Sequence, residues 1–225
     1  MSIQEKIEEA LSTILRVNLS IVGAGRTDAG VHAKQIFAHF DSVTKIDTNK
    51  LVHQLNAFLP DDIVIQHIFL VKKEAHARFD AISRSYIYQI CLRRNPFELD
   101  TSWQIYKQEY DVEKMNTAAA ILLEYTNFKC FSKSKTDVRT YNCSITEAKW
   151  HKEADMLKFT ISADRFLRNM VRAIVGTLLE VGLGKKTIKD FSRIIESEDR
   201  SEAGLSVPAK GLFLVRVEYP KEIFS

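Results

Sequence analysis

The chain has 225 residues and carries 32 Lys and Arg against 29 Asp and Glu, for a net charge of +3. It is 45% hydrophobic and 27% charged, which excludes a disordered tail, a low-complexity chain and a strongly charged nucleic-acid arm. A chain of this length suits one large domain or two smaller ones. Glycine is scarce, and three of the eight glycines fall between residues 23 and 30.

Hydrophobic periodicity and turn signals predict a mixture of helices and strands. In chain order we expect a helix over 2–17, strands over 19–22 and 32–40, a helix over 48–58, strands over 63–71 and 84–92, a helix over 111–124, strands over 142–151 and 156–163, helices over 166–182 and 187–197, and a strand over 212–219. Because this order is not a strict alternation, an α+β fold with a mixed, mainly antiparallel sheet flanked by helices fits best.

The acidic, loop-like stretch 95–110 is the best candidate for a boundary within the chain. It divides the sequence into an N-terminal half, 1–97, and a C-terminal half, 98–225. Each half mixes strands with helices. We expect the N-terminal half to carry a glycine-rich loop at 23–33.

Several classes of site are disfavoured by residue counts and spacing. No apolar run of about 18 residues predicts a transmembrane helix, and the acidic N-terminus is unlike a signal peptide. The three cysteines are odd in number with no CxxC pair, and the six histidines show no ligand spacing, so neither a disulfide framework nor a metal site is expected. We expect buried, reduced thiols in a cytoplasmic protein that makes no membrane contact.

Charge is distributed unevenly along the chain. Residues 72–94 hold six Lys and Arg and two acids, a net +4, and residues 129–172 hold ten and five, a net +5. Between them, residues 98–124 hold two Lys and six acids, a net −4. Two interpretations stay open: ordinary solvated charge, or a basic groove that binds a polyanion.

The glycine-rich loop reads Gly-Ala-Gly-Arg-Thr-Asp-Ala-Gly-Val-His-Ala over residues 23–33. It matches neither GxGxxG nor a P-loop, so a nucleotide-phosphate cradle is disfavoured. Asp28 lies at the centre of this loop, close to Arg26 in the sequence. The positive charge of Arg26 favours the ionised form of the Asp28 carboxylate, which a nucleophile or base requires. The alternative is a turn aspartate that caps its own loop.

Two other patterns involve candidate residues. Arg84 and Tyr86 share one strand face by period-2 alternation, which is also typical of a half-buried strand tyrosine. Arg165, Arg168 and Arg172 have the spacing of one helical face, which is also typical of the wet side of an amphipathic helix.

The loop at 23–33 resembles the active-site loop of the TruA-type tRNA pseudouridine synthases. Similar blocks follow in the family's order at 55–63, 76–81, 84–88, 166–176 and 208–214, so that the resemblance covers residues 2 to 219. It implies the pseudouridine synthase fold with two similar α/β halves, and an active-site cleft between residues 1–97 and 98–225. It also implies isomerisation of uridine to pseudouridine at positions 38–40 of the tRNA anticodon arm, by a homodimer and without metal or organic cofactor.

The resemblance also implies roles for single residues. Asp28 matches the catalytic aspartate, Arg172 the arginine that pairs with it, Tyr86 the tyrosine that stacks on the target base, and Leu212 an apolar residue that lines the pocket. Arginine suits phosphate recognition, so the candidates for phosphate or ribose contacts are Arg26, Arg78 and Arg84. The alternative for each of these three is a role in bracing the loop.

The chain departs from the family pattern at its start. Family members usually begin with a strand carrying Tyr-Asp-Gly and then a Gly-Trp-Gln segment, whereas here residues 1–5 align with the first helix. We therefore expect that one strand and its loop are absent. This departure gives weight to an alternative, a catalytically impaired RNA-binding or RNA-folding protein on the same scaffold. A small-molecule hydrolase is disfavoured, because Asp28 has no second carboxylate, metal cluster or P-loop lysine beside it.

Overall fold

A computed structural model describes residues 2–133 and 138–224 of the chain. The chain forms two compact units. The smaller unit consists of Met1–Arg26, Phe37–Ala81 and Tyr219–Ser225, and the larger unit of Thr27–Ile36 and Ile82–Glu218. This division differs from the halves expected on either side of residue 97, because the segment from Ile82 onward pairs with strands of the C-terminal half.

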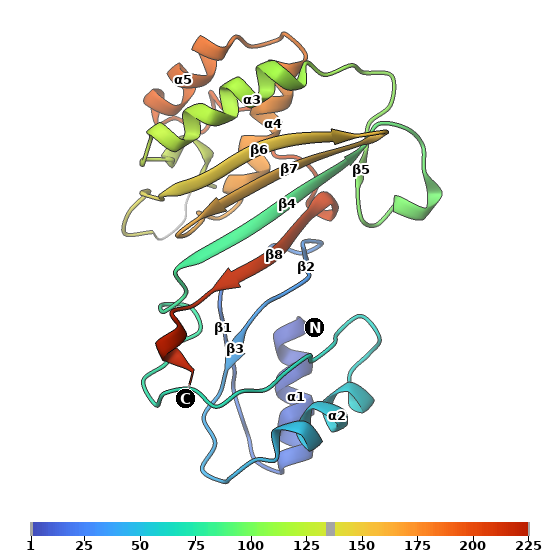
Figure 1. The fold of residues 1–225 in the computed structure, drawn as a ribbon, viewed down its shortest axis with the longest axis vertical. Helices are drawn as coiled ribbons and strands as arrows, with labels where there is room; N and C mark the ends of the chain where they lie inside the picture. The colour runs from blue at the N-terminus through green and yellow to red at the C-terminus, as the bar shows by residue number, and fades with distance from the viewer. Residues whose placement is uncertain (1, 134–137, 225) are drawn as a thin grey trace. The chain divides into compact units, whose positions relative to one another are not determined.

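The larger unit is built on a mixed sheet (Figure 1). The strands are, in spatial order, β2 (His32–Ala33), β8 (Leu212–Glu218), β4 (Ser83–Cys91), β7 (Met156–Ala163) and β6 (Ile145–Glu153), with β5 (Trp103–Gln104) paired to β4. The β2–β8 and β4–β5 pairs are parallel and the others are antiparallel. The predicted α+β fold with a mainly antiparallel sheet is therefore confirmed.

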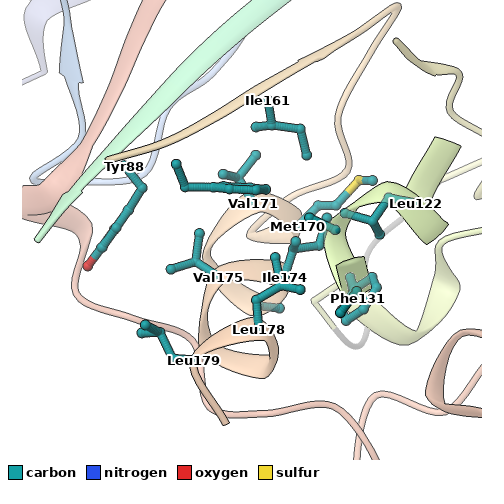
Figure 2. Packing of buried hydrophobic residues seen from close by; sticks show 14 of the residues in the cluster. Tyr88, Leu122, Phe131, Ile161, Met170, Val171, Ile174, Val175, Leu178 and Leu179 are labelled. Atoms are coloured by element: carbon teal, nitrogen blue, oxygen red, sulfur yellow. The ribbon is translucent and has the colours of Figure 1, made fainter. Parts of the chain in front are cut away.

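Helices cover this sheet in the larger unit (Figure 1). They are α3 (Val112–Ile121), α4 (Met170–Gly182) and α5 (Ile188–Ser197). The main hydrophobic core joins their apolar side chains to those of β4, β6 and β7. Every residue of α4 except Arg172 and Glu180 is buried, and Figure 2 shows its side chains packed with Ile161 of the sheet and with Leu122 and Phe131.

The smaller unit has its own core, formed mainly by two helices. α1 (Ile3–Leu15) and α2 (Thr48–Phe58) pack their apolar faces together, beside the short antiparallel pair β1 (Val22–Gly23) and β3 (Ala38–His39). Ser2 caps α1 in a capping box with Glu5. The two units thus have separate hydrophobic cores.

Two predicted strands of the N-terminal region are wrong. Residues 63–70 form no regular strand; instead the side-chain amide of Asn56 exchanges two 2.8 Å hydrogen bonds with the backbone of Ile65. The strand predicted over 32–40 is divided into β2 and β3 by a bend after Ala33. In the first segment the Asn56 side chain occupies the backbone N–H and C=O of Ile65, which a ladder would use.

The helix predicted over 166–182 begins only at Met170. The Asp164 carboxylate accepts the N–H groups of Ser144 and Arg165, both at 2.7 Å, and this holds the chain in a turn after β7. Asn169 then adopts a left-handed conformation with φ of 67° at the N-cap of α4. Arg165 and Arg168 therefore precede the helix, and the single helical face predicted for them with Arg172 is wrong.

None of the helices in the described ranges combines the length and apolarity that crossing a bilayer requires. The longest, α1 and α4, have 13 residues each.

The three cysteines are buried and free, as expected from the sequence. Burial raises the pKa of Cys130 and of Cys143 to about 12, so almost no thiolate forms at pH 8. We therefore expect the folded protein to resist a disulfide exchange reagent such as dithionitrobenzoate, and the unfolded chain to release three equivalents. Rapid labelling of the folded chain at Cys130 or Cys143 would contradict the burial described here.

Candidate active site

Three of the residues with candidate chemistry lie near one another in the larger unit: Asp28, Tyr86 and Arg172. The loop that carries Asp28 turns sharply after this residue: the Val31 N–H donates to the Asp28 carbonyl at 3.1 Å, and Gly30 has a φ of 81°. Glycine adopts this left-handed conformation without the strain that a side chain would add. The tight turn leaves the Asp28 side chain 27% exposed.

The loop is attached to the sheet on its C-terminal side. β2 pairs with β8, and the Lys34 N–H donates to the Leu214 carbonyl at 2.8 Å. The His32 ring stacks on Phe213 with centroids 4.6 Å apart, and its Nε2 lies 2.8 Å from the Asp100 carbonyl oxygen. Through these contacts His32 has a structural role: it attaches the C-terminal end of the loop to the sheet.

Arg172 reaches the loop from α4. Its Nε donates to the Val207 carbonyl at 2.6 Å, while the Val207 N–H donates to the Arg172 carbonyl at 3.2 Å. The segment 203–208 can approach α4 this closely because of glycine: a Cβ on Gly176 would lie 1.8 Å from the Leu205 carbonyl oxygen. The guanidinium of Arg172 is therefore held in place by the Val207 carbonyl, and its other nitrogens can bind a second partner.

The Asp28 carboxylate lies between two guanidinium groups. Arg172 Nη1 donates to Oδ2 at 3.3 Å, and the Nε of Arg168 lies 3.5 Å from Oδ1. The structure thus brings together Asp28 and Arg172, as the resemblance implies. It also adds Arg168, which the sequence analysis placed on a helical face but not at the site. The block 166–176 contains both arginines, but only the turn before α4 directs Arg168 toward Asp28.

Tyr86 lies on β4 near this carboxylate. Its ring meets Phe166 edge-on, with centroids 5.2 Å apart and planes at 88°. Burial raises the pKa of Tyr86 to about 12; the Arg84 charge opposes this rise and the Asp28 carboxylate adds to it. No group within the described residues hydrogen-bonds to its hydroxyl. A neutral ring with an unused hydroxyl suits contact with a flat ligand.

Its neighbour two residues along the strand has a different role. The Tyr88 hydroxyl donates to the Pro208 carbonyl at 2.8 Å, and burial raises the pKa of Tyr88 well above its usual value. Leu212 pairs with Tyr88 in the β4–β8 register and is 6% exposed within the main core. Leu212 therefore helps to fix the strand that carries the tyrosines.

The three arginines proposed for phosphate or ribose contacts fall in different places. Arg84, in the larger unit, donates through Nη1 to the Asp164 carbonyl at 2.7 Å. One of its hydrogen-bond donors therefore stabilises the turn after β7. Arg26 and Arg78 are exposed residues of the smaller unit. The guanidinium of Arg78 lies over the ring of Phe79, 5.9 Å from its centroid.

Metal ligands do not gather near the site. Over residues 2–133 and 138–224, no three His, Cys, Asp or Glu side chains are grouped as a metal ion requires.

Comparison of the sequence with known proteins identifies a family. The family profile for tRNA pseudouridine synthase matches residues 118–220. The tRNA pseudouridine synthase A of Bacteroides thetaiotaomicron is 51% identical over all of this chain and 84% of its own length. That of Parabacteroides distasonis is 52% identical over all of this chain and 89% of its own length. The tRNA pseudouridine synthase A 2 of Clostridium tetani is 39% identical over 97% of this chain and 88% of its own length.

The chain belongs to the tRNA pseudouridine synthase A family. As a tRNA pseudouridine synthase it is an isomerase. The family profile includes Arg168, Arg172 and Leu212, while the Asp28 loop lies outside it and within the matches to whole relatives.

In this tRNA pseudouridine synthase, replacing Gly176 by alanine tests the close approach that supports Arg172. The added methyl overlaps the Leu205 carbonyl, so we expect the free energy of unfolding to fall by about 1–3 kcal/mol. We also expect the activity to fall, because segment 203–208 moves away from Arg172. Denaturant unfolding measures the first effect.

The matched control is Gly25→Ala, whose added methyl has no atom within 4 Å. Its unfolding midpoint is expected to stay at the wild-type value. Equal midpoints for Gly176→Ala and the wild type would show that the packing of α4 against segment 203–208 is not tight.

Proposed function

We propose that this protein isomerises uridine to pseudouridine at positions 38–40 of the tRNA anticodon arm, with Asp28 as the catalytic carboxylate. The single observation that carries the proposal is the Asp28–Arg172 ion pair, which joins the glycine loop to α4 in a chain of the tRNA pseudouridine synthase A family. The proposal includes tRNA as the substrate, and a homodimer in the cytoplasm.

The isomerisation requires one anionic group beside the target nucleotide. The N-glycosidic bond must break, the detached uracil must turn, and the ring must rejoin the sugar through C5. Asp28 has three possible routes: attack on C1′, addition to C6 of the base, or removal of the C2′ proton. All three use a carboxylate anion, and the Arg172 guanidinium, held by the Val207 carbonyl, stabilises that charge in a partly buried position.

The target base has to leave the stack of the RNA to reach this carboxylate. We propose that Tyr86 stacks on the flipped base, and its neutral ring beside Phe166 supports this role. Leu212, buried next to Tyr88, lines the apolar side of the pocket. Water must be excluded while the free uracil turns, since the detached base would otherwise be lost.

Phosphate and ribose contacts are assigned to three arginines: Arg26, Arg78 and Arg84. Bidentate guanidinium–phosphate pairing is the physical reason. In the same proposal, the basic segments 72–94 and 129–172 bind the RNA backbone, which their net charges of +4 and +5 favour.

Replacing Asp28 by asparagine tests the central assignment. We expect the rate of pseudouridine formation to fall by about 100-fold or more, because an amide cannot act as nucleophile or base, without any weakening of tRNA binding. Carbodiimide-blocked primer extension on unmodified tRNA maps the product. The control, Asp61→Asn, alters an exposed turn aspartate and should keep wild-type activity.

Near-normal activity of Asp28→Asn would overturn the assignment of Asp28. Wild-type protein that binds tRNA without creating a new stop at positions 38–40 would overturn the proposed function, and would favour an RNA-binding or RNA-folding protein.

The Tyr86 ring and its hydroxyl can be tested separately. Because the pKa of Tyr86 is about 12, the side chain is neutral at any ordinary assay pH, and Tyr86→Phe changes no charge. We expect Tyr86→Phe to keep the wild-type pH–rate profile. We expect Tyr86→Ala to weaken transition-state binding by about 5- to 150-fold, the loss of one stacked ring.

Measurement of kcat/KM between pH 6 and pH 9 separates the two variants. If Tyr86→Phe is as defective as Tyr86→Ala, the hydroxyl rather than the ring is the functional group, and the stacking assignment is wrong.

A further inference from the structure

The two arginines beside Asp28 are held very differently. Arg172 is 20% exposed and has a second attachment at the Val207 carbonyl. Arg168 is 57% exposed, lies in the turn before α4, and meets Asp28 Oδ1 at 3.5 Å without the geometry of a hydrogen bond. Within the described residues its guanidinium has no other partner. An exposed ion pair of this kind contributes little stability and is screened by salt.

Both carboxylate oxygens of Asp28 are therefore covered in the free protein, Oδ2 by Arg172 and Oδ1 by Arg168. Each route open to Asp28 needs one oxygen to approach a carbon or a proton of the nucleotide. Arg172 is tied to the backbone and stays, whereas Arg168 can leave at small cost. Oδ1 is consequently the oxygen that becomes available when the substrate enters.

Every ribose in RNA is linked to phosphates through its 3′ and 5′ oxygens, so a ribose placed at Asp28 brings a phosphate near Arg168. We infer that Arg168 is both an RNA ligand and a positioning residue. In the free protein it pairs with Asp28, and on binding it transfers to a phosphate beside the target nucleotide and uncovers Oδ1. Guanidinium–phosphate pairing is bidentate and charge-assisted, which makes the exchange favourable.

This inference rests on the proposed function, because it takes a ribose at Asp28. It predicts that Asp28 and the RNA phosphate compete for the guanidinium of Arg168. Neutralising Asp28 should therefore strengthen tRNA binding, and part of that gain should depend on Arg168. Loss of repulsion between Asp28 and RNA would strengthen binding whether or not Arg168 is present.

The test is a double-mutant cycle on Kd for unmodified tRNA, measured with wild type, D28N, R168Q and D28N/R168Q. We expect D28N to tighten binding by about 3- to 10-fold in the wild-type background and by less than about 2-fold in the R168Q background. We expect R168Q to raise KM by about 10-fold and to leave kcat near wild type, since the pair of Asp28 with Arg172 is intact.

Salt dependence supplies a readout that a merely structural role would not change. Loss of one phosphate contact lowers the slope of log Kd against log salt concentration by about 0.7 to 0.9, and R168K should restore most of that slope. The matched control is R193Q, which removes an exposed arginine paired with Asp190 on α5 and should leave both Kd and slope unchanged. A melting temperature of R168Q equal to that of the wild type would show that the variant folds.

The inference is overturned if the effects of D28N and R168Q on Kd are additive, if R168Q leaves the salt slope unchanged, or if R168Q lowers kcat and leaves Kd unchanged. These outcomes are separate from failure of the proposed function, because the binding cycle needs no turnover. Wild-type protein that modifies the anticodon arm while the cycle is additive would overturn only the role of Arg168. Absence of modification at that arm would overturn the proposed function.

Discussion

The ion pair between Arg172 and Asp28 joins the two segments on which the site depends, the α4 helix and the loop between β1 and β2. α4 is buried along almost its whole length, so a guanidinium on it needs partners that replace water. One partner is the Val207 carbonyl and the other is the Asp28 carboxylate. The burial of α4 thus determines where the carboxylate must lie, and the turn at Gly30 brings the loop to that position.

Three glycines of the larger unit, Gly176, Gly204 and Gly211, allow close approach between packed segments. Gly176 and Gly204 lie where α4 meets the segment that follows α5, and a Cβ on either would overlap backbone atoms of the other segment. Gly211 has the same relation to Tyr88 and to the Gln89 carbonyl. These contacts tie Val207 and Pro208 to the helix and the strand, so that backbone carbonyls, which cannot change rotamer, hold Arg172 and Tyr88.

Alternation along β4 puts Tyr86 and Tyr88 on one face of the strand, and the structure gives them different contacts. The Tyr88 hydroxyl donates to the Pro208 carbonyl, while the Tyr86 ring lies edge-on against Phe166. Arg84, on the same face, donates to the Asp164 carbonyl. A period-2 pattern predicts a shared face, but it cannot tell which side chain on that face meets a backbone acceptor.

Local signals were sufficient for much of the fold. Helical periodicity predicts α1, and the helix predicted over 48–58 is α2 with the bounds that the structure has. Alternation predicts β4, β6 and β7, and the glycine-rich motif marks the loop around Asp28. Local signals failed where a side chain elsewhere in the chain bonds to the backbone: Asn56 bonds to the backbone of Ile65 in the segment predicted as a strand, and Asp164 accepts the Ser144 N–H in the turn before α4.

The sequence by itself determined the family, the α+β class and the segments that bear the candidate chemistry, because motifs and periodicity are properties of neighbouring residues. Only the tertiary structure decided which of those residues meet. Asp28 and Arg172 are 144 positions apart, and Arg168 reaches the carboxylate from a turn that its helical spacing does not predict. Contacts of this kind follow from how a buried helix, a loop and a backbone segment pack together, and no local pattern encodes that packing.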